Sequence, residues 1–119
     1  MTQAWAVDIP KWVLQMLNNL HEIDKKLVLH GDSGNARRNV EKIRDTFSEG
    51  FGLFYEDPLG QEFKETRTDL DATISGSETE CLVVVEVIKP IIRYGEVAFS
   101  RVVQKGVVVV EASIRSGEK

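Results

Sequence analysis

The residues that most often catalyse reactions or bind metals are few in this chain. Two histidines, His21 and His30, occur among 119 residues, and both fall in a segment predicted to be helical. Each residue turns a helix by roughly 100°, so their spacing places them on opposite faces, where they cannot share a metal ion. We expect each to be an exposed or helix-end histidine.

Carboxylates supply one candidate pair. Asp69 and Asp71 alternate along a predicted strand, and Glu78 and Glu80 follow them. Paired carboxylates can exchange protons or bind a hard cation. Acidic residues at alternate positions are also typical of the solvent-facing side of a strand, which is the role we expect here.

Cys81 is the single cysteine, which excludes an internal disulfide and a cysteine-based metal cluster. It opens a valine-rich segment, where we expect a packed, unreactive thiol.

The glycines at residues 31–34 and 50–52 match neither common phosphate-binding loop, and no nucleophile–base motif is present. The sequence therefore predicts no catalysis, no metal and no cofactor.

Composition narrows the class of protein further. A hydrophobic fraction of 42% suits a folded chain, and a net charge of −4 without a large basic cluster argues against nucleic acid as a partner. Residues 1–10 lack the pattern of a signal peptide, and the apolar stretches are too short to span a bilayer. We expect a cytoplasmic protein.

The elements that would position these residues begin with two amphipathic helices, at about 8–30 and 36–49, because apolar residues recur there at spacings of three and four. A glycine-containing turn separates them, and Asn35 can cap the second. A lone hairpin cannot cover such a broad stripe, so it must lie on a sheet or on a second copy, giving a four-helix bundle. We predict a dimer whose interface contains Val13, Met16, Leu17, Leu20, Ile23, Leu27, Val40, Ile43 and Phe47.

The chain after residue 50 is predicted to form short strands. They are expected at 67–74, 81–89, 97–103 and 107–114, with turns at 57–60, 94–96 and 104–106. The run Val83–Val85 indicates a strand buried on both faces. Helices followed by strands predict an α+β fold, with a helical dimerisation region over residues 1–50 and a small all-β domain over 51–119.

Several segments resemble the GrpE family of nucleotide exchange factors. Val13–His21 is similar to the family's helix "LLpvLDNLERAL", with Asn18-Asn19-Leu20 where the family has Asp-Asn-Leu. Four later segments resemble its β domain in the same order: Phe51–Phe54, Gly60–Phe63, Val83–Val87 and Ser100–Val110. The family's His-Glu-Ala-Val segment is replaced by residues 67–73, and its long paired N-terminal helix has no counterpart before residue 10. The resemblance therefore leads us to expect either a shortened piece of a family member or a minimal, divergent member of the family.

The resemblance implies a homodimeric co-chaperone whose β domain binds the ATPase domain of a DnaK-type chaperone and promotes ADP release. Carried over by position, it implies that Arg101, Val110 and Ile92 contact the chaperone. Two other functions remain open. The chain could be an adaptor that kept the fold and lost exchange activity, or a small α+β domain that binds a small ligand in a polar pocket.

Overall fold

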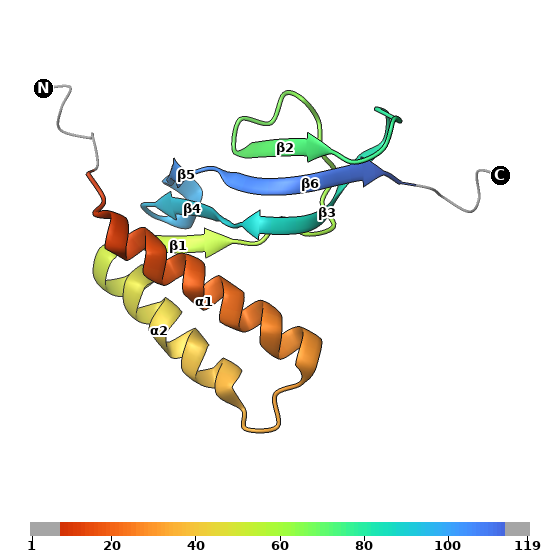
Figure 1. Ribbon diagram of the computed structural model, residues 1–119. Coiled ribbons are helices and arrows are strands. Elements are labelled where there is room, and N and C mark those ends of the chain that lie inside the picture. Colours follow the sequence, from red (N-terminus) through yellow and green to blue (C-terminus); the bar gives the residue numbers. More distant parts are fainter. Residues whose placement is uncertain (1–7, 114–119) are drawn as a thin grey trace, which may run out of the picture.

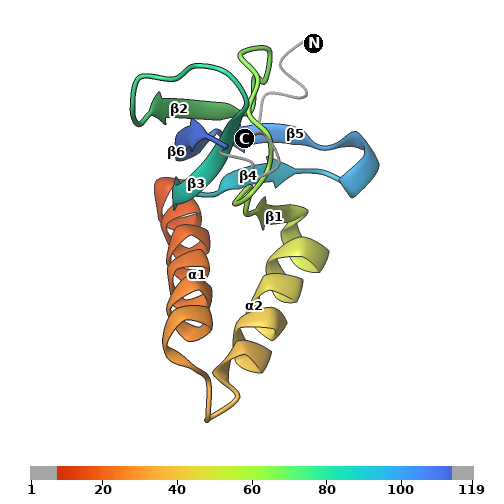
Figure 2. The same ribbon diagram turned by 90° about the vertical axis from the view of Figure 1, so that its right-hand side faces the viewer.

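The computed structural model describes residues 8–113. In this part of the chain two helices precede six strands, which form two three-stranded sheets, and this confirms the α+β class. The helices lie below the sheets (Figure 1), and they meet at their connecting loop and spread apart toward the sheets (Figure 2).

The helices α1 (Lys11–His30) and α2 (Ala36–Phe51) lie where the apolar periodicity predicts them. The prediction that Asn35 caps α2 is wrong, because its side chain makes no capping hydrogen bond. Asp32 takes that role, since its carboxylate accepts hydrogen bonds from the backbone N–H groups of Ala36 (2.6 Å) and Arg37 (2.9 Å). Gly52, with a φ of 70°, ends α2 in the left-handed conformation that glycine adopts without strain.

The first sheet is antiparallel and has the strand order β1 (Leu53–Glu56), β4 (Ile91–Tyr94) and β5 (Arg101–Gln104). The second has β6 (Gly106–Ala112) in the centre, parallel to β2 (Leu70–Ile74) and antiparallel to β3 (Leu82–Lys89). A strand was expected over 97–103, but a short 3₁₀ helix, η2 (Val97–Phe99), occupies its first part.

Two of the three connections between the sheets are single residues. β3 continues into β4 through Pro90, and β5 continues into β6 through Lys105. The turn predicted at 104–106 is therefore wrong, because the chain passes there from one sheet to the other without reversing. Gly106 is required at this crossing, since a Cβ atom would lie 2.8 Å from Cδ2 of Leu70 and 3.0 Å from Cγ1 of Ile91.

Two hydrophobic cores correspond to the two sheets. The first is shared by both helices and the first sheet, so it crosses the predicted boundary at residue 50; it contains Val13, Leu17, Leu20, Val40, Phe47, Leu53 and Ile92. The second contains Leu70, Leu82, Val84, Val87, Ile91, Val108 and Val110. The helical stripe was predicted to lie either on a sheet or on a second copy of the chain. In this fold the first sheet covers much of the stripe.

Strand β3 is buried on one face only, which corrects the expectation of burial on both. Val84 is fully buried, whereas Val85 is 42% exposed. The pairing of β3 with β6 is irregular between Val84 and Glu86, as at a β-bulge. The run of valines correctly indicated a strand, but it did not indicate that one face of this strand is exposed.

Candidate functional site

The predicted dimer interface is divided between the core and the surface. Its buried members are Val13, Leu17, Leu20, Val40 and Phe47, and Leu27 packs against the same core. Met16, Ile23 and Ile43 remain more than two-fifths exposed. These three residues, together with the exposed Trp12, form what we call the outer stripe.

The three predicted partner-binding residues have different environments. Arg101 is exposed at the start of β5, opposite Tyr94 in the β4–β5 pairing. Ile92 and Val110 are fully buried in the first and second cores. Neither buried side chain offers surface to a partner in this conformation, because each packs within a hydrophobic core.

Aromatic side chains gather at the same end of the first sheet as Arg101. Phe51 and Tyr94 are exposed, and Phe99 is 86% exposed. The N–H of Gly95 donates to the carbonyl oxygen of Gly52 (2.8 Å), which joins the β4–β5 connection to the end of α2. We call Phe51, Tyr94, Phe99 and Arg101 the aromatic end. Exposed aromatic and arginine side chains are the types that dominate protein–protein binding energy.

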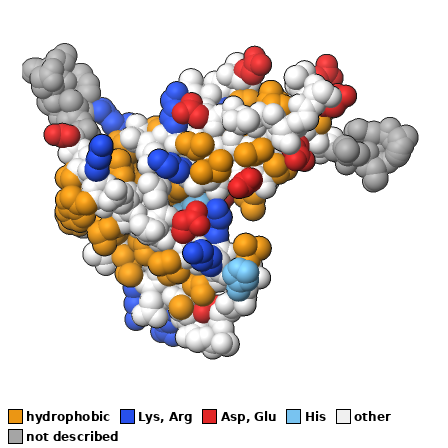
Figure 3. All heavy atoms as spheres, viewed as in Figure 1, with side chains coloured by type: hydrophobic (Ala, Val, Ile, Leu, Met, Phe, Trp, Pro, Cys, Tyr) orange, Lys and Arg blue, Asp and Glu red, His pale blue; other side chains and the backbone are white. Residues whose placement is uncertain are grey.

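A groove of about 420 Å³ lies where the helices meet the sheets. α1 and the start of α2 form one wall, and β1, the turn after it and β3 form the other. Figure 3 shows the molecule hollowed between its helical and sheet parts. Its volume lies within the range of small-molecule pockets, about 300–1,000 Å³.

His21 forms part of the groove wall, and the expectation of an exposed histidine is wrong. Its side chain is 2% exposed, and Nε2–H donates to Oδ2 of Asp57 (2.8 Å). Its Nδ1 has no hydrogen-bond partner among the described residues. The sequence did contain the signal: His21 follows Leu20 and lies one turn after Leu17, on the stripe that is buried.

Tyr55 lies beside this histidine, with ring centroids 5.6 Å apart in an edge-on arrangement. Its hydroxyl is also buried without a hydrogen-bond partner in the described structure. Burial raises the pKa of Tyr55 to about 12, so the hydroxyl stays protonated. The guanidinium of Arg44 lies 5.2 Å from the centre of the ring.

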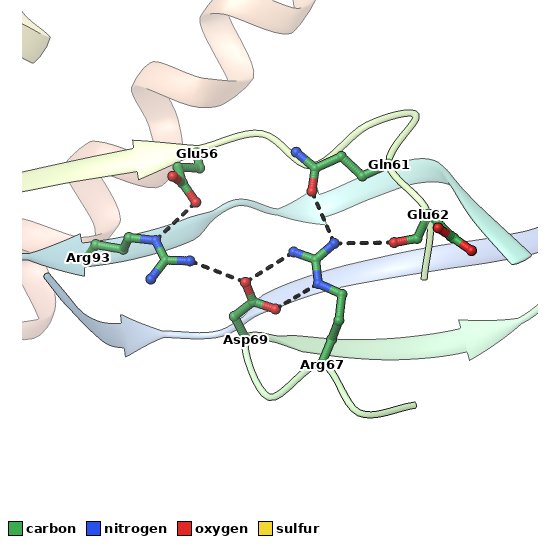
Figure 4. Close-up of polar contacts among 6 residues, drawn as sticks. All are labelled: Glu56, Gln61, Glu62, Arg67, Asp69 and Arg93. Carbon is green, nitrogen blue, oxygen red and sulfur yellow. Dashed lines mark hydrogen bonds and ion pairs between the residues drawn. The ribbon is translucent and has the colours of Figure 1, made fainter. Parts of the chain in front are cut away.

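A separate ion-pair network joins the long loop before β2 to the first sheet (Figure 4). Arg67 donates two hydrogen bonds to the carboxylate of Asp69, each 3.0 Å long. Arg93 bridges Asp69 (3.2 Å) and Glu56 (2.9 Å). Asp71 instead is 64% exposed, near Lys105. Asp69 and Asp71 therefore form no acid–base pair, because two arginines already neutralise the first.

This network predicts a loss of stability in acid. The hydrogen bonds from Arg67 hold the pKa of Asp69 below its ordinary value, although burial opposes them. A carboxyl with a lower pKa when folded stabilises the fold above its unfolded pKa, about 3.9, and this contribution is lost as pH falls through the folded value. We expect Asp69→Asn to flatten the decline of the unfolding free energy below about pH 4, measured by urea titration. Asp71→Asn should keep the wild-type slope; equal slopes for all three proteins would contradict the assignment.

The remaining chemical candidates contribute no site. Cys81 is exposed, so the expectation of a packed thiol is wrong; it precedes β3 with a φ of 58° rather than lying in the strand. Among residues 8–113, no three His, Cys, Asp or Glu side chains gather to hold a metal ion. No helix in the described range combines the length and apolar character needed to cross a membrane.

Comparison with known proteins found no matching family model, curated protein or solved structure.

Proposed function

We propose that this chain acts by binding another protein, as a GrpE-like nucleotide exchange factor for the ATPase domain of a DnaK-type chaperone. The observation that carries the proposal is the aromatic end, where Arg101 is exposed beside Tyr94 and close to the exposed Phe99. The order of a helical hairpin followed by small sheets, and the resemblance of five segments to the GrpE family, favour this partner over others.

The proposal includes a homodimer formed through the outer stripe. Met16, Ile23 and Ile43 are exposed apolar residues on two neighbouring helices, and Trp12 continues their row on α1. A second copy would remove this surface from water and produce a four-helix arrangement. The aromatic end belongs to the first sheet and to the end of α2, and remains available to the chaperone.

The proposed mechanism is a shift between two states of the chaperone. A factor that binds the open nucleotide cleft more tightly than the closed one increases the open population and releases ADP. Moving a cleft from mostly closed to mostly open takes a preference of about 10⁴-fold, or about 5.5 kcal/mol. By thermodynamic linkage this effect is reciprocal. Bound ADP lowers the chaperone's affinity for this chain by the same factor by which this chain, when bound, lowers the chaperone's affinity for ADP.

The test uses a DnaK-type chaperone from the same organism loaded with a fluorescent ADP analogue. We expect wild-type protein to accelerate release, and Arg101→Ala to weaken binding about tenfold, because an arginine in a desolvated interface can form paired hydrogen bonds with a carboxylate. Phe99→Ala should weaken it in the same way. Arg38→Ala, an exposed arginine on α2, is the matched control and should bind like wild type.

Other outcomes separate the alternatives. Binding without faster release would identify an adaptor that has the fold but not the exchange activity. Normal behaviour of Arg101→Ala together with failure of Arg38→Ala would move the working surface to the helices. A chain that neither binds the chaperone nor changes nucleotide release would refute the proposed function.

A further inference from the structure

The groove beside His21 has an apolar rim that the described fold leaves uncovered. Leu29 is 74% exposed, and Val28, Leu59 and Val85 are each more than two-fifths exposed. They come from α1, the turn after β1, and β3, so they face one hollow from both walls. Apolar side chains gathered around a concave surface are typical of a site that receives an apolar group.

The charged side chains of the groove are paired with one exception. Asp24 binds Arg37 (2.9 Å), and Asp57 accepts from His21. Lys25 contacts Glu22 (3.3 Å). Glu86 is exposed and forms no ion pair with the described residues. Glu86 is therefore the carboxylate of the groove that has no ion-pair partner among the described residues, which favours a cationic group on the occupant.

The backbone of β3 adds a reason to expect a polypeptide. β3 is an edge strand, because it pairs with β6 on one side only. Residues 60–63 cover the first half of its outer edge through hydrogen bonds such as Gly60 N–H to the Val84 carbonyl (2.9 Å). Beyond Val84 no described strand pairs with this edge, and the Lys25 ammonium occupies the carbonyl of Val87 (2.8 Å), so a peptide N–H would have to displace Lys25 there. An extended peptide can hydrogen-bond to such an edge.

We propose that this groove binds a short extended segment of a partner polypeptide, in which a large apolar side chain stands next to a Lys or Arg. The apolar side chain enters between α1 and β3, the basic residue pairs with Glu86, and the main chain runs along the open half of β3. The inference is independent of the proposed exchange activity, which uses the aromatic end of the other sheet.

The proposed dimer would leave the groove open. Ile23 belongs to the outer stripe and Lys25 to the groove wall, and two residues along a helix correspond to a rotation of about 200°. The two surfaces therefore lie on different sides of α1. The aromatic end is also separate, since none of its residues lines the groove.

Fluorescence anisotropy with two labelled peptides tests the proposal. Both carry Leu-Phe-Leu, flanked by lysines in one and by glutamates in the other. We expect the wild-type protein to bind the lysine peptide about tenfold more tightly, and Glu86→Lys to reverse this preference. The double variant Leu29→Gln, Leu59→Gln should weaken binding of both peptides about tenfold or more. Ile88→Gln, a half-exposed residue of β3 outside the groove, is the matched control and should change neither affinity.

Several outcomes would overturn the inference. Equal affinity for the two peptides in wild type and Glu86→Lys would remove the role of Glu86. Binding of an apolar dye but of neither peptide would indicate a pocket for small molecules. Dissociation of an oligomer by the double variant, seen by sedimentation, would show that the groove is an interface between copies. Nucleotide release by the same variants should stay at the wild-type rate. A negative result with the peptides would therefore refute the groove proposal without bearing on the exchange proposal.

Discussion

We expect Leu17→Ala to lower the free energy of unfolding by about 2–5 kcal/mol, the range for removing a large aliphatic side chain from a packed core. Leu17 is 0% exposed and packs in the core shared by α1, α2 and the first sheet. Alanine would leave a cavity that the rigid sheet on one side cannot fill. Urea unfolding followed by circular dichroism measures the change.

The neighbouring residue provides the control. Met16 is 45% exposed on the outer stripe, so Met16→Ala should cost less than about 1 kcal/mol. Ile23→Asp, also on the outer stripe, should stay folded but sediment as a monomer, because it places a charge in the proposed dimer interface. If instead Leu17→Ala were as stable as wild type and monomeric, Leu17 would face a second copy rather than the sheet.

We expect Gly106→Val to lower the free energy of unfolding by about 1–3 kcal/mol, the usual range for forcing extra carbon atoms into a packed site. Its Cβ would lie 2.8 Å from Cδ2 of Leu70, 3.0 Å from Cγ1 of Ile91 and 3.4 Å from the Ile91 backbone nitrogen. The side chain of Leu70 can rotate, but the backbone of Ile91 is fixed by β4. The loss should appear as a lower melting temperature in calorimetry.

Gly34→Ala is the matched change, because a Cβ there meets nothing within 4 Å and the backbone is not left-handed. It should melt close to the wild-type temperature. If Gly106→Val also melted there, the crossing between β5 and β6 would have to be wider than the structure shows.

The local part of the fold could be predicted from the sequence. Apolar residues at spacings of three and four identified α1 and α2, and β-branched runs identified β3 and β6. The errors arise where a distant contact decides the outcome. His21 lies on the buried stripe of α1, but its partner Asp57 follows β1, and no periodicity within α1 reports that partner.

The same limit applies to the sites. The groove is lined by α1, the start of α2, β1, the turn after β1 and β3, segments that no single window of sequence contains. Pairing of β5 with β4 places Arg101 beside Tyr94, a neighbour set by register rather than by sequence spacing. Lys105 resembled a turn residue because it stands next to Gly106. In the structure it instead connects the two sheets, and this crossing depends on Leu70 and Ile91, which pack against Gly106.

The central position of β6 bears on the order in which the chain can fold during synthesis. β2 and β3 do not pair with each other; each pairs with β6, which is made after both. While the ribosome is still extending the chain, the helical hairpin can form from its own local contacts, but β2 and β3 must wait with unpaired edges. Such edges are the usual sites of aggregation in incomplete chains. A chain that stops before Gly106 would keep its helices and lose the strand that joins the other two, so the second sheet can form only once β6 has left the ribosome.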